Sequence, residues 1–372
     1  MRSHEKDAGW LARKLRLLAL SAVLILAACA SRPSGLLAPV APTSGGRQVS
    51  VLAVSTREPA ASAAVVYSGR RGDETSLSIV DVSIPPGHRP GRIETPRSGP
   101  PRAQEHFAAL SVQPIDEAGV DAWLATHARN GRVLIYVHGF NMPFDHAVFR
   151  VAQIATDSRL DAAPVLFAWP SRGSSWAYLY DRESANFSRD ALERVLRQAC
   201  LNPEITEVNI LAHSMGAWLV LEALRQAAIR DGALSPKLRN VVLASPDLDV
   251  DVFMRQFDAL GPTRPHFTFL ISRRDFALRV SRLLAGGVQR LGAADPQAEP
   301  FKTKLESTGG VTLIDLSGLA RQGSLNHSKY ASSPEVVKRL GALFIDSGGH
   351  ELPGPYGYPR GSSSDEAETE PQ

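Results

Sequence analysis

Three residues whose types together perform nucleophilic catalysis each follow a separate apolar run. Ser214 lies in Leu211–Gly216, LAHSMG, after the run VNIL; Asp275 follows FTFLISR, and His327 follows VTLIDLS after a further short segment. A serine hydroxyl becomes a good nucleophile when a histidine takes its proton, and a carboxylate holds that imidazole in the right tautomer. Ser214, His327 and Asp275 are therefore the candidate nucleophile, base and acid.

A catalytic serine also needs donors for the negative charge that develops on the substrate oxygen. The backbone N–H of Met215 would lie at the positive end of a helix, and that of Phe140 follows a predicted strand in the segment HGFN. Gly139 would let the backbone approach closely, and His138 and His213 are expected to shape the site. Met215 and Phe140 are the predicted oxyanion donors.

Two of these assignments have alternatives. The segment PDLDVD offers Asp247 or Asp249 as the acid in place of Asp275. Its D-x-D-x-D spacing resembles a calcium loop, but Val252 stands where such a loop needs glycine, so no metal and no cofactor are expected. Ser214 taken alone is also compatible with an ordinary helix N-cap, since serine is favoured there.

The elements that must position these residues alternate between apolar runs and helical patterns. The candidate strands are 49–56, 77–84, 133–139, 164–170, 207–214, 240–247, 267–273 and 311–317. The candidate helices, with apolar residues three or four apart, are 144–158, 185–200, 216–232 and 333–347. This alternation predicts an α/β fold, a doubly wound and mostly parallel sheet with helices on both faces. The carboxyl ends of its strands would bring the candidate residues to one edge.

The motifs, in this order, resemble those of the α/β-hydrolase superfamily. Its nucleophile elbow G-x-S-x-G corresponds to A-H-S-M-G, with Ala212 in place of the first glycine, and its chain order is also serine, acid, histidine. More narrowly, HGFN, WPS, AHSMG, SPDLD and NHSKY together resemble a bacterial esterase- or lipase-like family, mainly of unknown function. The resemblance covers most of residues 48–345 and implies a serine hydrolase that acts on esters.

The start of the chain is typical of a secretory signal. Arg13, Lys14 and Arg16 precede the apolar stretch Leu17–Ala28, which is too short for a typical spanning helix. The sequence L-A-A-C that ends at Cys29 resembles the bacterial lipoprotein box. The resemblance implies that Cys29 is lipidated and becomes the mature N-terminus; the alternative is a soluble secreted protein cleaved nearby.

These features divide the chain into four predicted parts: signal peptide (1–28), flexible tether (29–47), hydrolase domain (48–347) and disordered acidic tail (348–372). The predicted location is the bacterial cell envelope, held by the lipid anchor. The outer membrane is preferred, because Ala30 stands where inner-membrane lipoproteins carry aspartate.

Charge gives no support for a nucleic-acid partner, and the cysteine content argues against an internal disulfide. The first 28 residues hold five of the 41 basic and two of the 38 acidic residues, so 36 of each remain. The basic balance of the full chain is therefore no argument for a nucleic-acid partner. With Cys29 assigned to the lipid, Cys200 stands alone and no internal disulfide is expected.

The predicted function is cleavage of an ester or lipid substrate through an acyl-enzyme. An acyltransferase with the same triad, and a non-catalytic binding lipoprotein on a hydrolase fold, are the alternatives. The segment 281–310 is expected to be a lid or a surface helix and loop. Four aromatic residues are expected either to line an acyl pocket or to pack in the core: Trp169, Trp176, Tyr178 and Tyr180.

Overall fold

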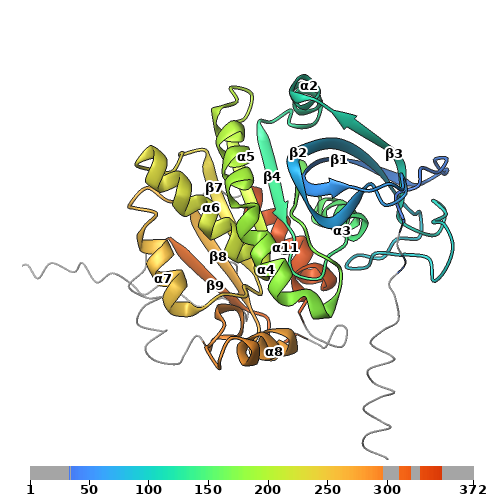
Figure 1. Cartoon of the computed structure of the whole chain (residues 1–372). Coiled ribbons are helices and arrows are strands. Elements are labelled where there is room, and N and C mark those ends of the chain that lie inside the picture. Colours follow the sequence, from blue (N-terminus) through green and yellow to red (C-terminus); the bar gives the residue numbers. More distant parts are fainter. Residues whose placement is uncertain (1–32, 34, 296–309, 320–326, 346–372) are drawn as a thin grey trace, which may run out of the picture.

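A computed structural model describes residues 33, 35–295, 310–319 and 327–345 (Figure 1). Its strands are β1 (Arg47–Pro59), β2 (Tyr67–Ile84), β3 (Ala108–Ile115), β4 (Arg132–Val137), β5 (Ala163–Ala168), β6 (Glu207–His213), β7 (Leu238–Ala244), β8 (His266–Ile271) and β9 (Val311–Asp315). Its α-helices are α2 (Glu117–His127), α3 (Phe144–Asp157), α4 (Tyr178–Phe187), α5 (Arg189–Leu201), α6 (Met215–Asp231), α7 (Val250–Asp258), α8 (Phe276–Leu284), α10 (Lys329–Ser332) and α11 (Pro334–Ile345). Two 3₁₀ turns complete the described elements, η1 (Ser175–Ala177) and η2 (Leu291–Ala293).

In the described part of the chain, the strands form one sheet in the order β3-β2-β1-β5-β4-β6-β7-β8-β9. Strands β1, β5, β4, β6, β7, β8 and β9 are parallel, and the β1–β2 and β2–β3 pairs at one edge are antiparallel. The predicted mostly parallel α/β fold is thus confirmed. Strand β3 was not predicted, because as an edge strand it is half-exposed and lacks a continuous apolar run.

Successive residues of the central strands face opposite sides of the sheet, and each side has its own core. In β4, Val133, Ile135 and Val137 face a cluster built with α2, α4, α5, α6 and α7. Leu134 and Tyr136 face a second cluster built with α3, α10 and α11. Helices therefore cover both faces of the sheet, as Figure 1 shows.

The order of the strands places a topological switch between β4 and β6. After β4 the chain winds through α3 to β5 on one side, and then returns through α4 and α5 to β6 on the other side of β4. In doubly wound sheets, ligands bind outside the carboxyl ends of the strands at such a switch. The segments that follow β4 and β6, HGFN and HSMG, are thus at the expected position for a site.

Two predicted segments differ from the structure. The predicted helix 185–200 is two helices, α4 and α5, separated at Ser188. Ser188 is fully buried, and its Oγ bonds Thr56 Oγ1 at 2.8 Å and the Ser184 carbonyl at 2.9 Å. Local side-chain hydrogen bonds of this kind compete with helix continuation.

Within the predicted tether 29–47, Leu36 and Leu37 differ from the expectation of a flexible chain. Leu36 and Leu37 are fully buried in the core that α3 helps to form, and the Leu36 N–H donates to Asp145 at 3.3 Å. Burial of these two side chains outweighs the flexibility expected from the Ser, Pro and Gly content. The signal peptide, Cys29 and the tail 348–372 lie outside the described residues. None of the helices within the described ranges is long and apolar enough to cross a bilayer.

Candidate active site

Ser214 lies on a strained turn between β6 and α6. Its backbone has φ 53° and ψ −120°, a conformation that non-glycine residues rarely adopt and that gathers at functional sites. Among the described residues, the Ser214 side chain makes no capping hydrogen bond to α6. Gly216 makes the turn possible, because a Cβ at that position would lie 2.4 Å from the His138 carbonyl oxygen. This strained backbone is what the predicted nucleophile elbow requires, whereas an ordinary N-cap residue is extended and bonds its own helix.

The segments after β4, β6 and β7 meet at this serine. The Ser214 N–H donates to the Ala244 carbonyl at 2.9 Å, and its own carbonyl accepts from the Asp247 N–H at 3.2 Å. On the other side, a Cβ added to Gly139 would come within 3.0 Å of the Ser214 Cβ. The HGFN loop therefore lies directly against the elbow.

His327 and Asp275 are joined by a hydrogen bond of 2.7 Å from Nδ1 to Oδ2. Asp275 is fully buried, and its other oxygen, Oδ1, accepts from the Leu278 N–H at 3.1 Å and so caps α8. The carboxylate is thereby fixed by its own helix. Because Nδ1 of His327 is engaged with Asp275, Nε2 is the nitrogen available for proton transfer.

His213 connects His327 to the elbow. Its ring centroid lies 4.7 Å from that of His327, and its Nε2 donates to the His327 carbonyl at 3.2 Å. Burial and the neighbouring His327 lower the pKa of His213 well below its ordinary value, so the ring is neutral. His327, with Asp275 behind it, therefore lies against the residue that immediately precedes Ser214.

The alternative acids are engaged elsewhere. Asp247 accepts from Ser281 Oγ at 2.5 Å and from the Tyr178 hydroxyl at 3.0 Å, and it pairs with the buried Arg290. Asp249 caps α7 by accepting from the N–H groups of Asp251 and Val252. Of the three carboxylates considered, Asp275 is the one that contacts His327.

The two proposed oxyanion donors flank the elbow. Met215 is the first residue of α6, and an N–H group in a first helical turn has no partner within the helix. Phe140 belongs to the HGFN loop, in which Asn141 has φ 58° and donates its N–H to Asp181 at 3.1 Å. The next N–H, that of Met142, donates to Ser171 Oγ at 3.0 Å. Loop and helix terminus are thus both held beside Ser214.

Sequence patterns gave no indication of the buried arginine that holds this loop. Arg57 is 1% exposed, and its Nη2 donates to the Met142 carbonyl at 2.7 Å and to His138 Nε2 at 3.1 Å. Because Nε2 accepts from Arg57, Nδ1 of His138 carries the proton and donates to the Gly139 carbonyl at 2.8 Å. Burial lowers the pKa of Arg57 to about 10, and burial together with Arg57 lowers that of His138 to about 3.

Asp181, in the first turn of α4, is a second buried residue that holds this loop and that sequence patterns did not indicate. It is fully buried and accepts from Ser171 Oγ at 2.5 Å, from the Arg172 N–H at 3.0 Å and from the Asn141 N–H. Burial raises the pKa of this carboxyl, while these hydrogen bonds oppose the rise. Asp181 therefore ties the loop after β5 to the loop after β4.

The four aromatic residues have different environments. Trp169 is buried and stacks on His138 with centroids 4.7 Å apart, so it belongs to the core. Tyr178 packs edge-on against Phe140, with ring centroids 5.4 Å apart, and so lies beside the HGFN loop. Tyr180 lies under the Arg172 guanidinium at 3.9 Å, whereas Trp176 is 87% exposed. Of the segment 281–310, residues 296–309 lie outside the described residues.

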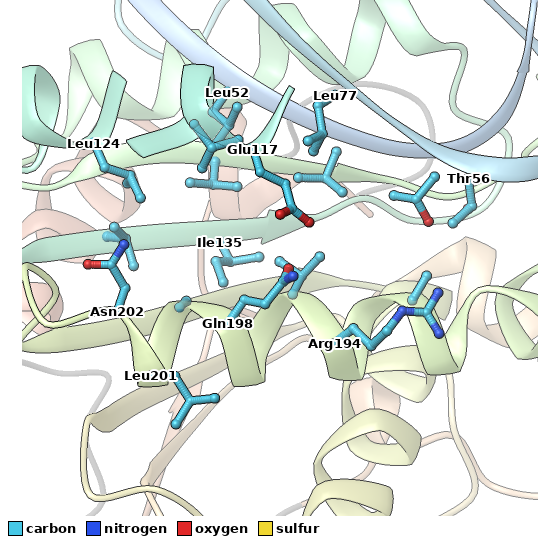
Figure 2. A pocket seen from close by; sticks show the side chains of 18 of the residues that line it. Leu52, Thr56, Leu77, Glu117, Leu124, Ile135, Arg194, Gln198, Leu201 and Asn202 are labelled. Atoms are coloured by element: carbon cyan, nitrogen blue, oxygen red, sulfur yellow. The ribbon is translucent and has the colours of Figure 1, made fainter. Parts of the chain in front are cut away.

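A separate cavity of about 880 Å³ opens between α2 and α5 over the middle of β1, β4 and β5 (Figure 2). Leu52 and Ile135 form part of its floor, and Glu117, Arg194 and Gln198 stand around it. It is lined by none of the candidate catalytic residues, all three of which are among the described residues. Across the described ranges, no group of three or more His, Cys, Asp or Glu side chains is arranged to hold a metal ion.

The sheet, its switch point and the elbow define an α/β-hydrolase fold. Residues 116–343 match a family described as alpha/beta hydrolases of unknown function (DUF900). Since the match spans more than half of the chain, the chain belongs to this family. No curated protein matches it in sequence.

Solved structures of similar fold have low sequence identity to this chain. A lipase–esterase related protein from Clostridium acetobutylicum ATCC 824 is 12% identical, with 58% of this chain and 95% of that chain covered and a TM-score of 0.33. An esterase from Pyrobaculum calidifontis is 14% identical, with 89% and 92% covered and a TM-score of 0.33. An esterase from Pyrococcus furiosus is 11% identical, with 58% and 82% covered and a TM-score of 0.34.

Proposed function

We propose that this protein is a serine hydrolase that cleaves carboxylic esters through an acyl-enzyme intermediate. The observation that carries the proposal is the 2.7 Å hydrogen bond between His327 Nδ1 and the buried Asp275, next to a serine on a strained strand-to-helix turn. A histidine oriented by a carboxylate is the base that a serine nucleophile needs.

In the acylation step, Ser214 Oγ attacks the ester carbonyl carbon while His327 Nε2 takes the hydroxyl proton. The N–H groups of Met215 and Phe140 stabilise the oxyanion, each typically by about 3–4 kcal/mol. The tetrahedral intermediate collapses, the C–O bond to the alcohol breaks, and His327 returns its proton to the leaving oxygen. Asp275 stabilises the imidazolium in between.

In the deacylation step, His327 takes a proton from water as the water oxygen attacks the acyl carbon. The second intermediate collapses, the bond from the acyl carbon to Ser214 Oγ breaks, and His327 returns its proton to Oγ, so the carboxylic acid leaves and the free serine is restored. An alcohol in place of water would give acyl transfer with the same residues. Product analysis with an added alcohol separates the two reactions, because a hydrolase gives mainly free acid and an acyltransferase gives mainly the new ester.

The test is a panel of p-nitrophenyl esters of increasing acyl length, with full-length protein and Ser214→Ala. We expect hydrolysis by the parent and a loss of about 10⁴-fold or more in kcat for the variant. An intact parent that hydrolyses none of these esters, or a variant as active as the parent, would contradict the proposal.

We further propose that Cys29 carries a lipid and anchors the protein in the bacterial envelope, as the L-A-A-C sequence suggests. Mass spectrometry of the mature N-terminus tests this in cells that process lipoproteins. A diacylglyceryl group on Cys29, absent from Cys29→Ser, is the expected result, and an unmodified cysteine would contradict it.

A further inference from the structure

Large apolar side chains are exposed at the edge of the sheet that carries the candidate site. Trp176, in η1, is 87% exposed, and Leu179, at the start of α4, is 77% exposed. On α8, Phe276, Val280 and Leu283 are 52%, 41% and 77% exposed. We call these five residues the mouth surface. Large apolar side chains exposed in neighbouring segments are typical of an interaction site.

The mouth surface consists of two segments: η1 with the start of α4, and α8. Each follows the carboxyl end of a strand, the first that of β5 and the second that of β8. Figure 1 shows α4 and α8 at the same edge of the sheet. They are joined by the Tyr178 hydroxyl, which lies 3.1 Å from Ser281 Oγ on α8 and also donates to Asp247. The contact uses the buried side of α8, and it makes the two segments neighbours at this edge of the sheet.

Helix α8 separates its apolar residues into two sets. Phe276, Val280 and Leu283 recur at i, i+4 and i+7, so they form one exposed stripe. Leu278 and Ser281 lie on the opposite side and are 1% and 5% exposed. The core thus takes one side of the helix, and the stripe is presented outward.

Helix α8 and the residues after it, 276–288, carry basic charges only, whereas α4 also contains the buried Asp181 and the exposed Glu183. Residues 169–180 and 276–288 contain Arg172, Arg279 and Arg282 and neither aspartate nor glutamate. Exposed tryptophan and leucine side chains mixed with arginine suit the boundary between lipid headgroups and acyl chains, and arginine adds attraction to anionic lipids. The composition of 276–288, apolar and basic without acidic residues, matches an anionic lipid surface better than a polar protein partner.

We propose that the mouth surface docks on an anionic lipid surface. The docking itself is independent of the proposed hydrolase activity; the consequence that an ester would enter the site from the lipid rests on that activity. Asp275 caps α8 at its first turn and bonds His327, so the docked helix carries the acid of the candidate triad.

The first test places a single environment-sensitive nitrobenzoxadiazole label on Leu283→Cys in the full chain. The background is Ser214→Ala, Cys29→Ser and Cys200→Ser, so neither catalysis nor a lipid anchor contributes. The matched control is Ile229→Cys, which is 64% exposed near the other end of α6. The vesicles are phosphatidylglycerol with phosphatidylethanolamine, or phosphatidylcholine alone.

We expect a blue shift of emission at position 283 with the anionic vesicles and none at position 229. No shift at 283, or equal shifts at both positions, would overturn the proposal. Because the Ser214→Ala background is inactive by design, docking without activity in the parent would refute only the proposed function.

The second test measures vesicle affinity for Arg279→Gln and Arg282→Gln, with Arg225→Gln on α6 as the control. Each arginine near an anionic surface contributes about 1 kcal/mol, so each variant should bind about fivefold more weakly at low salt. The control should bind as the parent does. Affinity that depends neither on lipid charge nor on these arginines would overturn the assignment of an anionic surface.

Discussion

Asp275 has two roles that its two oxygens keep separate. Oδ1 accepts from the first turn of α8, and Oδ2 accepts from His327. The capping bond fixes the carboxylate, and the carboxylate in turn fixes the ring. The orientation of the imidazole therefore depends on a helix terminus as well as on a single side chain.

Asp275→Asn tests this role of the acid. The amide keeps the size and the capping oxygen but cannot stabilise the imidazolium, and it favours the wrong tautomer, so kcat should fall by about 10⁴-fold. The measurement is kcat and KM on a soluble ester, with thermal unfolding to confirm the fold. Asp249→Asn is the control, since asparagine caps helices as well as aspartate does, and it should retain activity. Similar losses in the two variants would contradict the assignment.

At the residue scale, the sequence predicted the candidate catalytic residues, which follow strand ends. It did not predict the buried residues that hold the neighbouring loops in place. Ser214, Asp275 and His327 were predicted because each follows an apolar run. Arg57 and Asp181 act through contacts with residues far away in the chain, and their neighbours in sequence carry no motif. Side-chain burial of this kind is a property of the assembled fold, so no local pattern could reveal it.

At the scale of elements, the elbow requires close packing of α6 against the end of β4. Gly216→Ala would place a Cβ 2.4 Å from the His138 carbonyl oxygen. Helix and loop would have to separate, so we expect a stability loss of about 1–3 kcal/mol and little activity in the folded variant. Denaturant unfolding and ester turnover measure both. Gly87→Ala, where nothing lies within 4 Å of the added carbon, should change neither.

The HGFN loop is positioned by β1 through Arg57. In Arg57→Gln, the Met142 carbonyl and His138 Nε2 would lose donors that they now have at 2.7 Å and 3.1 Å. A small displacement of the oxyanion donors lowers turnover more than binding, so kcat should fall by about 10²-fold while KM changes little. Steady-state kinetics well below the unfolding temperature check this. An unchanged kcat, or a loss confined to KM, would exclude a positioning role.

Most elements were predictable because the strands of a parallel sheet are buried on both faces and appear as apolar runs. The exceptions were decided by long-range contacts. Ser188 interrupts a helical pattern by bonding Thr56, and Leu36 is buried against the domain although its neighbours indicate a tether. In each case a tertiary contact overrides the local composition.

At the scale of the whole molecule, a buried histidine joins an N-terminal loop to the helices near the site. His88 Nδ1 and Nε2 lie 2.8 Å from Glu94 and from Asp157 of α3. Gln153 donates both to Asp157 and to the Ala331 carbonyl of α10. Helix α10 begins two residues after His327, so this cluster supports the segment that carries the proposed base.

Burial lowers the pKa of His88, but its bonds to the two carboxylates outweigh burial, so the pKa is raised in the folded protein. The stabilisation is then complete below the unfolded pKa and is lost as pH rises through the folded pKa. We expect the unfolding midpoint to fall as the pH rises above about 6.5, the ordinary pKa of histidine, and to fall less in His88→Gln. Denaturation at several pH values measures both, and parallel profiles for parent and variant would contradict this role.

The central claim is that Ser214 is a nucleophile activated by His327. Labelling of the full-length protein with a fluorophosphonate probe, followed by peptide mass spectrometry, tests it most directly beside Ser214→Ala and His327→Ala. The account predicts a covalent adduct on Ser214 in the parent, none in Ser214→Ala and strongly slowed labelling in His327→Ala. A folded parent that remains unlabelled, or an adduct on another serine, would contradict it.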